Sequence, residues 1–270
     1  CGGAAAGGGA DGDVEFPFLT LLTSGGHCQL LLTRGVGRHQ VIGSTLDDAL
    51  GEAYDKVARL LELPVGGGGG PALEALARDG DPASVALPVP MRQKKNYDFS
   101  FAGLKTAVRL AVQRAPDERR AEPSFNADVA ASFQHAAISH LEQRLRYAME
   151  LCATSGEAWG GAPRTLVVSG GVAANKELRR RLQALCDATP APDADGRSWR
   201  LVVPPPRLCT DNGVMVAWAA IEQLRHGVSH EAEGQQVRAR WPLGTAVPGT
   251  MLPVSKKSKY GARKHVIEAS

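Results

Sequence analysis

Two short glycine turns hold the residues of this sequence best suited to binding an anion. Ser24–Gly26 separates two apolar runs within Phe16–Thr33, and Ser169–Gly171 follows the apolar run Thr165–Val168. Adjacent glycines let a backbone approach a ligand closely, so that its N–H groups can face a phosphate. The first turn alone would fit an ordinary hairpin better than a phosphate site. Because a strand followed by Ser-Gly-Gly occurs twice, the sequence favours a pair of phosphate-binding turns.

Acidic side chains near predicted loop ends add a second kind of chemistry. Asp48 and Asp55 fall on one face of a helix predicted over Leu46–Leu63, and Asp211 precedes a later helix. Carboxylates can hold a metal ion that bridges phosphate oxygens, or they can accept hydrogen bonds from ribose hydroxyls. Such a row is more often a solvated surface, and Asp211 or Thr210 could simply cap the helix. Both roles stay open from spacing alone.

Several familiar nucleotide and hydrolase motifs are absent from the sequence. There is no Walker sequence GxxxxGK[ST], no GxGxxG after a predicted strand and no GxSxG elbow. Neither turn serine has a defined base, which argues against a serine hydrolase. The histidines offer no metal pair on a helix, because His135 and His140 do not share a face and His226 and His230 lie past a helix end.

Alternating strands and helices must position the two turns. The first turn joins the two strands of a hairpin within Phe16–Thr33, and Pro71 begins a short helix that carries Glu74 one turn inside. Further elements are predicted over Leu46–Leu63, Ala102–Arg114, Ala127–Ala153, Thr165–Leu185, Leu201–Val203 and Val214–Arg225. This alternation predicts an α/β protein.

Composition bounds the class of protein. The chain has 270 residues, 43% of them hydrophobic, so it can bury a sizeable core as one large domain or two lobes. Its net charge of +3 is too small to indicate nucleic acid binding by itself. Five scattered cysteines without a CxxC pair suggest neither a zinc knuckle nor a disulfide framework. No apolar run approaches the roughly 20 residues of a membrane span, so no membrane partner is expected.

Three regions are predicted along the chain. Residues 1–13 form a Gly/Ala-rich linker, residues 14–243 form the folded domain, and residues 244–270 form a basic flexible tail. Within that tail, Ser255–His265 holds five Lys or Arg and no acid, which suits a solvated end or an RNA contact. The start at Cys1 within the low-complexity stretch suggests a fragment or a processed product.

Six motifs in a fixed order resemble one family, the tRNA threonylcarbamoyladenosine synthases, formerly called glycoproteases or M22 peptidases. They are SGGH (Ser24–His27), DDALGEAYDK (Asp47–Lys56), the Gly-Gly-Pro that ends at Pro71, YDFSFAGLKT (Tyr97–Thr106), SGGVAAN (Ser169–Asn175) and PPPRLCTDNG (Pro204–Gly213). The resemblance runs from Phe16 to Leu243. The last motif is most similar to the organellar eukaryotic branch, which in turn resembles the bacterial enzymes.

The resemblance implies a fold and an activity. The expected fold is the two-lobed α/β fold of actin, Hsp70 and the sugar kinases (ASKHA), with mostly the second lobe present. The expected activity is that of an acyltransferase, N6-L-threonylcarbamoyladenine synthase. It moves the threonylcarbamoyl group of threonylcarbamoyl-adenylate to the adenosine beside the anticodon of tRNAs that read ANN codons.

The resemblance also implies roles for individual residues. The substrate-binding residues would be Leu22, Thr23, Ser24, Gly25 and Gly26 on the phosphate side, Asp55 and Glu74 at the ribose, Gly70 near the base, and Asn175 in the second turn. Asp211 matches one of three ligands of a divalent metal, iron or zinc, bound once per subunit. The other two ligands belong to an HxxxH helix in a first lobe that would precede Cys1, so the metal site is expected to be incomplete and the chain weakly active alone. No side chain is an evident general base.

Partners and location follow from the resemblance in the same way. Threonylcarbamoyl-adenylate and tRNA are the expected ligands, and a second copy or a paralogue could be a protein partner. The expected compartment is the mitochondrion, with plastid or cytoplasm as alternatives. Two other functions stay open: a catalytically impaired scaffold that binds tRNA or a paralogue, and a small-molecule kinase of the same superfamily.

Overall fold

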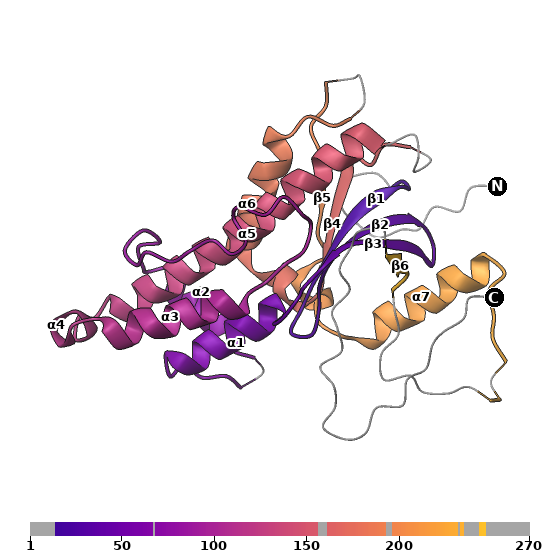
Figure 1. Cartoon of the computed structure of the whole chain (residues 1–270). Helices are drawn as coiled ribbons and strands as arrows, with labels where there is room; N and C mark the ends of the chain where they lie inside the picture. The colour runs from indigo at the N-terminus through magenta and orange to yellow at the C-terminus, as the bar shows by residue number, and fades with distance from the viewer. Residues whose placement is uncertain are drawn as a thin grey trace, which may run out of the picture.

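A six-stranded mixed sheet organises the chain in the computed structural model (Figure 1), which describes residues 14–66, 68–155, 161–192, 196–231, 233–234 and 243–246. The predicted linker 1–13 lies outside these residues. The strand order is β5-β4-β1-β2-β3-β6. The strands are β1 Phe18–Thr23, β2 Cys28–Gly35, β3 Arg38–Ser44, β4 Thr165–Ser169, β5 Arg200–Val202 and β6 Thr245–Ala246.

The predicted hairpin is confirmed as β1 and β2, which pair antiparallel from Phe18 opposite Thr33 to Thr23 opposite Cys28. The third strand, β3, continues the antiparallel meander, and β6 pairs with it in parallel. Thus two residues of the predicted tail form a strand, while residues 247–270 lie outside the described part of the chain. Side chains along β1 alternate between buried and half-buried, so Leu19 and Leu21 lie on the core face.

The pairing of β1 with β4 brings the two glycine turns together. These strands are parallel, with Leu22 opposite Ser169, so both turns leave the same edge of the sheet. The contact is close enough to require glycine, because a Cβ on Gly170 would lie 2.3 Å from the carbonyl oxygen of Thr23. Gly170 also has φ +98°, in the left-handed region that glycine alone adopts without strain.

Helices cover the sheet and extend from one side of it (Figure 1). They are α1 Leu50–Leu60, α2 Gly70–Ala77, α3 Ala102–Arg114, α4 Asp117–Arg120, α5 Phe125–Ser155, α6 Lys176–Ala188 and α7 Gly213–Arg225, with short 3-10 turns at Gly171–Ala174 and Pro206–Leu208. The bounds predicted for α3 are confirmed, and α5 extends two residues beyond its prediction at each end. The chain is therefore α/β, as predicted.

The predicted start of α1 is wrong by four residues. Leu46 N–H donates to the carbonyl of Phe99, and the Asp47 carboxylate accepts from the backbone of Phe101 and Ala102. The apolar spacing predicts a helix from Leu46, but Leu46 and Asp47 instead bond to the segment that leads into α3. Helix α1 begins only at Leu50.

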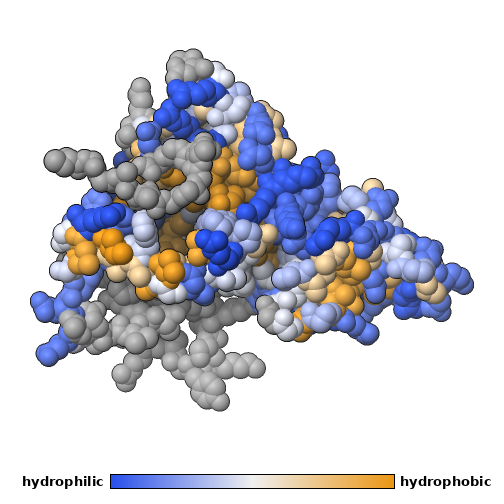
Figure 2. All heavy atoms as spheres, turned by 180° about the vertical axis from the view of Figure 1, so that it is seen from behind, coloured by the Kyte–Doolittle hydropathy of each residue, from blue (hydrophilic) through white to orange (hydrophobic). Residues whose placement is uncertain are grey.

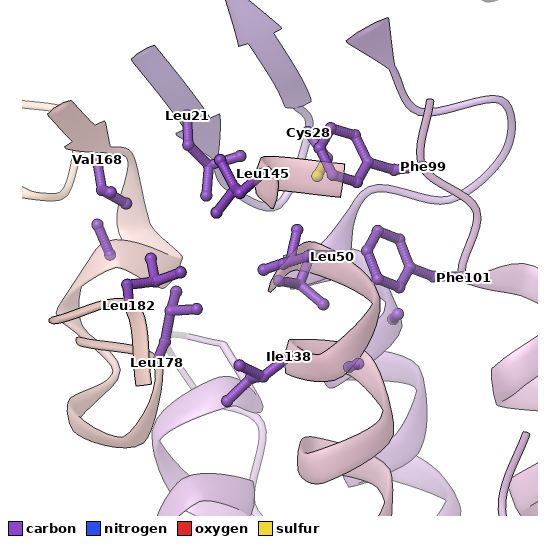
Figure 3. Packing of buried hydrophobic residues seen from close by; sticks show 14 of the residues in the cluster. Leu21, Cys28, Leu50, Phe99, Phe101, Ile138, Leu145, Val168, Leu178 and Leu182 are labelled. Carbon is purple, nitrogen blue, oxygen red and sulfur yellow. The ribbon is translucent and has the colours of Figure 1, made fainter. Parts of the chain in front are cut away.

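The core lies between the sheet and α5. Figure 3 shows Leu21 of β1 close to Leu145 of α5, with Leu178 and Leu182 of α6 on one side and Phe99 and Phe101 on the other. All of these side chains are buried. Because α5 contacts the sheet, α3 and α6 at once, it fixes the relative positions of the elements that carry the two turns.

Helix α7 differs from the other long helices because none of its residues is buried. Val216 is 69% exposed and Trp218 is 50% exposed, and Figure 2 shows apolar side chains gathered on this part of the surface. In Figure 1 the helix lies beyond the side of the sheet opposite to α1–α6. None of the described helices combines the length and the hydropathy of a membrane span.

Candidate functional site

One cavity of about 300 Å³ lies where the two glycine turns meet α1, α2 and the amino end of α6. Its wall is formed by Gly25, Gly51, Tyr54, Asp55, Gly68, Gly70, Pro71, Glu74, Gly171, Val172, Ala174, Asn175 and Thr210. Five residues assigned to substrate binding from the sequence are therefore in one wall: Gly25, Asp55, Gly70, Glu74 and Asn175. They come from four separate stretches of the chain.

The first turn is held by its own serine. Ser24 Oγ accepts hydrogen bonds from Gly26 N–H at 3.2 Å and from His27 N–H at 3.0 Å. The amides of Gly26 and His27 are therefore engaged inside the turn, and only Gly25 contributes to the cavity wall. Leu22, Thr23, Ser24 and Gly26 lie outside that wall, with Leu22 and Thr23 at the end of β1 behind it.

Glycines at the cavity are of two kinds. A Cβ on Gly25, Gly70 or Gly171 would meet no protein atom within 4 Å, and none of these residues has a positive φ. Neither packing nor backbone conformation requires glycine at these three positions, but any side chain there would occupy space at the cavity wall. Gly51 is different, because its Cβ would lie 2.7 Å from the nitrogen of Gly25. Gly51 allows α1 to pack on the turn.

Two carboxylates line the cavity, and each is anchored by one oxygen. Asp55 Oδ1 accepts from Gly69 N–H at 2.6 Å, and Glu74 Oε1 accepts from Lys176 N–H at 2.8 Å. The second bond places Glu74 at the amino end of α6. A carboxylate has two oxygens, so each side chain keeps one acceptor that can bind a hydroxyl group of a ligand.

Asn175 caps α6 and links it to α5. Its Oδ1 accepts from Leu178 N–H at 2.8 Å, and its Nδ2 donates to Gln134 Oε1 at 3.0 Å. Tyr54 donates to the same Gln134 oxygen at 3.4 Å. These buried bonds aim the amino end of α6, with its partial positive charge, at the cavity. Asn175 thus acts on the site at least in part by positioning the helix.

Tyr54 was missed as a site residue because it belongs to the apolar stripe of α1. It is buried, and this burial raises the pKa of Tyr54 well above its usual range, so the phenol stays neutral. The only feature of the sequence that could have pointed to Tyr54 as a site residue is its position next to Asp55. Gln134 had no signal, because it lies on α5, far from both glycine turns in sequence.

Asp48 is not a surface acid and does not reach the cavity, so both roles considered for it are wrong. Its side chain is buried and lies 2.8 Å from Lys56 Nζ and 3.4 Å from Lys105 Nζ. Burial alone would raise the pKa of Asp48, but the two lysines outweigh it and hold the pKa below its usual range. The carboxylate connects α1 to α3.

Asp211 lies beside the cavity, because its neighbour Thr210 is in the wall. Neither residue caps α7, since Asn212 Oδ1 accepts from Met215 N–H at 3.0 Å and is the cap. Asp211 is exposed. Within the described ranges, no three His, Cys, Asp or Glu residues form a group that could hold a metal ion. The residues described here therefore do not make a complete metal site.

The sheet, the paired turns and the cavity define an α/β protein of the actin, Hsp70 and sugar-kinase class. Comparison with known proteins is more specific. The profile of the TsaD family, tRNA N6-adenosine threonylcarbamoyltransferase, matches residues 2–218. The chain belongs to this family.

Curated relatives carry the same name. The chain is 48% identical over 230 residues to the tRNA N6-adenosine threonylcarbamoyltransferase of Rhizobium leguminosarum bv. trifolii (strain WSM2304), which covers 85% of the chain and 59% of the relative. The protein of that name from Granulibacter bethesdensis is 46% identical over 241 residues, or 89% of the chain and 60% of the relative. The chain thus spans about three fifths of these relatives. Both organisms are bacteria, so an organellar origin stays a prediction.

Proposed function

We propose that this chain supplies the adenylate-binding cavity of a tRNA threonylcarbamoyltransferase. The observation that carries the proposal is the meeting of five predicted substrate-binding residues in one cavity wall. Membership of the family and the names of the relatives support the same activity. The cavity volume is at the lower end of the range for small-molecule sites, which suits a nucleoside monophosphate.

Each part of an adenylate has a matching part of the wall. The phosphate would lie by Gly25 and Gly171, where no side chain intrudes and the amino end of α6 favours negative charge. The ribose hydroxyls would donate to the remaining oxygens of Asp55 and Glu74. The base would lie near Gly70, whose missing side chain leaves room for a flat ring.

The proposed reaction is the transfer of an acyl group to an amine. The exocyclic amine of the tRNA adenosine attacks the carbonyl of the mixed anhydride, a C–N bond forms and the C–O bond to the phosphate breaks. The amine loses a proton, and AMP leaves with the electron pair. The Gly25 turn and the α6 amino end would stabilise charge on the departing phosphate, and holding both substrates in place supplies the rest.

The divalent metal expected from the family has one candidate ligand, Asp211, among the described residues. No step of the reaction is assigned to it. Iron or zinc, a protein partner that is a second copy or a paralogue, and a mitochondrial location all remain proposals that rest on the resemblance.

Binding of AMP tests the cavity directly. Gly25→Val would place a branched side chain in the wall, and we expect AMP to bind about tenfold more weakly or worse, a loss of about 1.4 kcal/mol. Gly103→Val is the matched control, because Gly103 also has open space around it but lies in α3, away from the wall. Isothermal titration of both variants and the wild type gives the comparison. Equal affinities for Gly25→Val and the wild type would refute the cavity assignment.

The transfer itself is tested with the longest natural polypeptide that contains this sequence. Asp55→Asn should reduce incorporation of labelled threonine into tRNA at least tenfold, while Gly103→Val should leave it unchanged. Folded protein that binds AMP but transfers nothing would favour the scaffold alternative. ATP hydrolysis that does not depend on tRNA would favour the kinase.

A further inference from the structure

A long irregular connection joins α2 to α3. Residues 78–101 contain no helix or strand of their own, yet they run against α5 over much of its length. Connections longer than about 15 residues without secondary structure are uncommon in compact domains, and they are usually functional or disordered. This one is held in place by many hydrogen bonds, so disorder does not explain it.

Polar side chains along α5 hold this connection. Asp128 Oδ1 accepts from Asp81 N–H at 2.8 Å, and His140 Nε2 accepts from Ser100 N–H at 3.2 Å. Ser132, between them in the sequence of α5, accepts from Val85 N–H at 3.2 Å. An irregular backbone has no neighbouring strand to accept hydrogen bonds from its N–H groups. Because buried N–H groups need acceptors, side chains of α5 take this role. The connection thus has a fixed shape.

Arg144, one turn beyond His140 on α5, holds residues 91–96, here called the 91–96 loop. Its guanidinium is fully buried and donates to the carbonyls of Met91 at 2.6 Å and Asn96 at 2.9 Å, and also to that of Lys94. Burying a charge is costly unless its donors find acceptors, and here backbone carbonyls accept from both Nη atoms, whereas the buried Nε has no hydrogen-bond partner among the described residues. Met91 has φ +50°, a strained conformation that the same bonds maintain.

The fixed loop presents a basic surface. Arg92, Lys94 and Lys95 are all exposed, and residues 82–97 contain no acid. Arg146 on α5 is exposed as well. Lys95 lies 5.8 Å from the ring centre of Tyr147.

The acid that pairs with Lys95 does little to neutralise it. Glu150 lies 3.9 Å from Lys95, but the two side chains are 64% and 78% exposed, and such a pair contributes little. The result is a set of exposed cations on a loop whose backbone is held by Arg144, and one of them, Lys95, lies beside the half-buried ring of Tyr147.

We propose that the 91–96 loop, together with Arg146 and Tyr147, is a contact surface for the phosphate backbone of tRNA. The proposal rests on the proposed function, because tRNA is the substrate that would bring phosphates to the protein. Exposed lysines and arginines at fixed positions match a chain of phosphates, and a ring among them can stack on an unpaired base. The buried Arg144 lowers the entropy cost of binding, because the loop is already ordered before the RNA arrives.

Salt dependence of RNA binding is the test. The wild type and a variant with Arg92→Ala, Lys94→Ala and Lys95→Ala are titrated against an unmodified tRNA transcript that reads an ANN codon, between low and moderate salt. Each lost phosphate contact lowers the slope of log affinity against log salt by about 0.7 to 0.9, so the slope should fall by about 2 to 3. Affinity at low salt should fall at least tenfold. Exchange of the same three residues between Lys and Arg should preserve both values.

A second triple variant controls for total charge. Arg78, Arg109 and Arg114 are exposed arginines on or beside α2 and α3, and replacing all three by Ala removes the same charge without touching the loop. We expect it to keep nearly the wild-type slope. Equal losses in the two triple variants, or no loss in the loop variant, would overturn the proposal.

Two further measurements separate this proposal from the proposed function. The loop variant should bind AMP like the wild type, since the loop is no part of the cavity wall. Failure of the wild type to bind AMP, with the RNA result intact, would refute the cavity and leave the RNA contact standing. Tighter binding of the wild type to phosphatidylserine vesicles than to tRNA would overturn the RNA contact instead.

Discussion

Protonation of His140 should destabilise the fold at mildly acidic pH. The imidazole is fully buried between the rings of Phe99 and Phe101, at centroid distances of 5.9 and 5.4 Å. Its Nε2 accepts the hydrogen bond from Ser100 N–H, so this nitrogen must stay unprotonated. Burial, and then the positive charge of Arg144, lower the pKa of His140 from 6.5 to about 3, against smaller opposing effects of Asp47 and the Pro90 carbonyl.

The sign and size of the effect follow from these two pKa values. Between pH 6.5 and 3 the unfolded chain binds a proton at His140 that the folded protein does not bind. The contribution of neutral His140 to the free energy of unfolding is therefore fully present above pH 6.5. It falls by about 1.4 kcal/mol for each pH unit below that value. At pH 5 the free energy of unfolding should be about 2 kcal/mol lower than at pH 7.

Urea unfolding at pH 7 and pH 5 measures this difference. His140→Gln keeps an acceptor for Ser100 N–H but cannot be protonated there, so it should remove most of the difference. The same substitution at His39 is the matched control. Burial also lowers the pKa of His39, but this side chain is only partly buried, so its replacement should change the pH difference less. An unchanged pH difference in His140→Gln, or equal stability of the wild type at both pH values, would refute the reasoning.

Two further predictions concern the second glycine turn and the cap of α6. Gly170→Ala should lower the free energy of unfolding by about 3 kcal/mol or more, because its Cβ would clash with the Thr23 carbonyl at 2.3 Å in a left-handed conformation. A Cβ at Gly171 has open space, so Gly171→Ala should be as stable as the wild type but bind AMP more weakly. Equal losses of thermal stability in the two alanine variants would contradict this distinction between the glycines. Asn175→Ala removes the α6 cap and a partner of Gln134, so it should cost about 1 to 3 kcal/mol in urea unfolding and also weaken AMP binding. A variant of full stability and full affinity would contradict the positioning role.

Local patterns predicted the elements that depend on neighbouring residues. The hairpin within Phe16–Thr33 was predicted from two apolar runs around a glycine turn, and the helix Ala102–Arg114 from its local sequence. Both are confirmed. The start of α1 was wrong because Asp47 and its neighbours bond to the segment before α3, and spacing along one helix cannot show that contact.

The cavity was predictable only in part. Ser-Gly-Gly after an apolar run predicted the two turns, while the resemblance to a family assigned Asp55, Gly70, Glu74 and Asn175, and the structure places all four in one wall. The prediction that Asp48 is a surface acid or a ligand-binding residue was wrong. Its ion pairs with Lys56 and Lys105 depend on the packing of α1 against α3, which the sequence does not show. The hydrogen bonds of residues 78–101 to α5 likewise join positions far apart in sequence.

The parallel pairing of β1 with β4 has a consequence for how the protein folds. Leu19 and Leu166 are opposite one another, although the whole helical layer from α1 to α5 lies between them in the chain. Contacts between such distant segments should form slowly, because closing the long intervening segment costs entropy before the contacts stabilise it. Both glycine turns therefore come together only once β1 and β4 have paired. A nucleotide that binds between the two turns binds only the state in which β1 and β4 are paired. It would therefore stabilise that pairing and oppose the separation of the two strands.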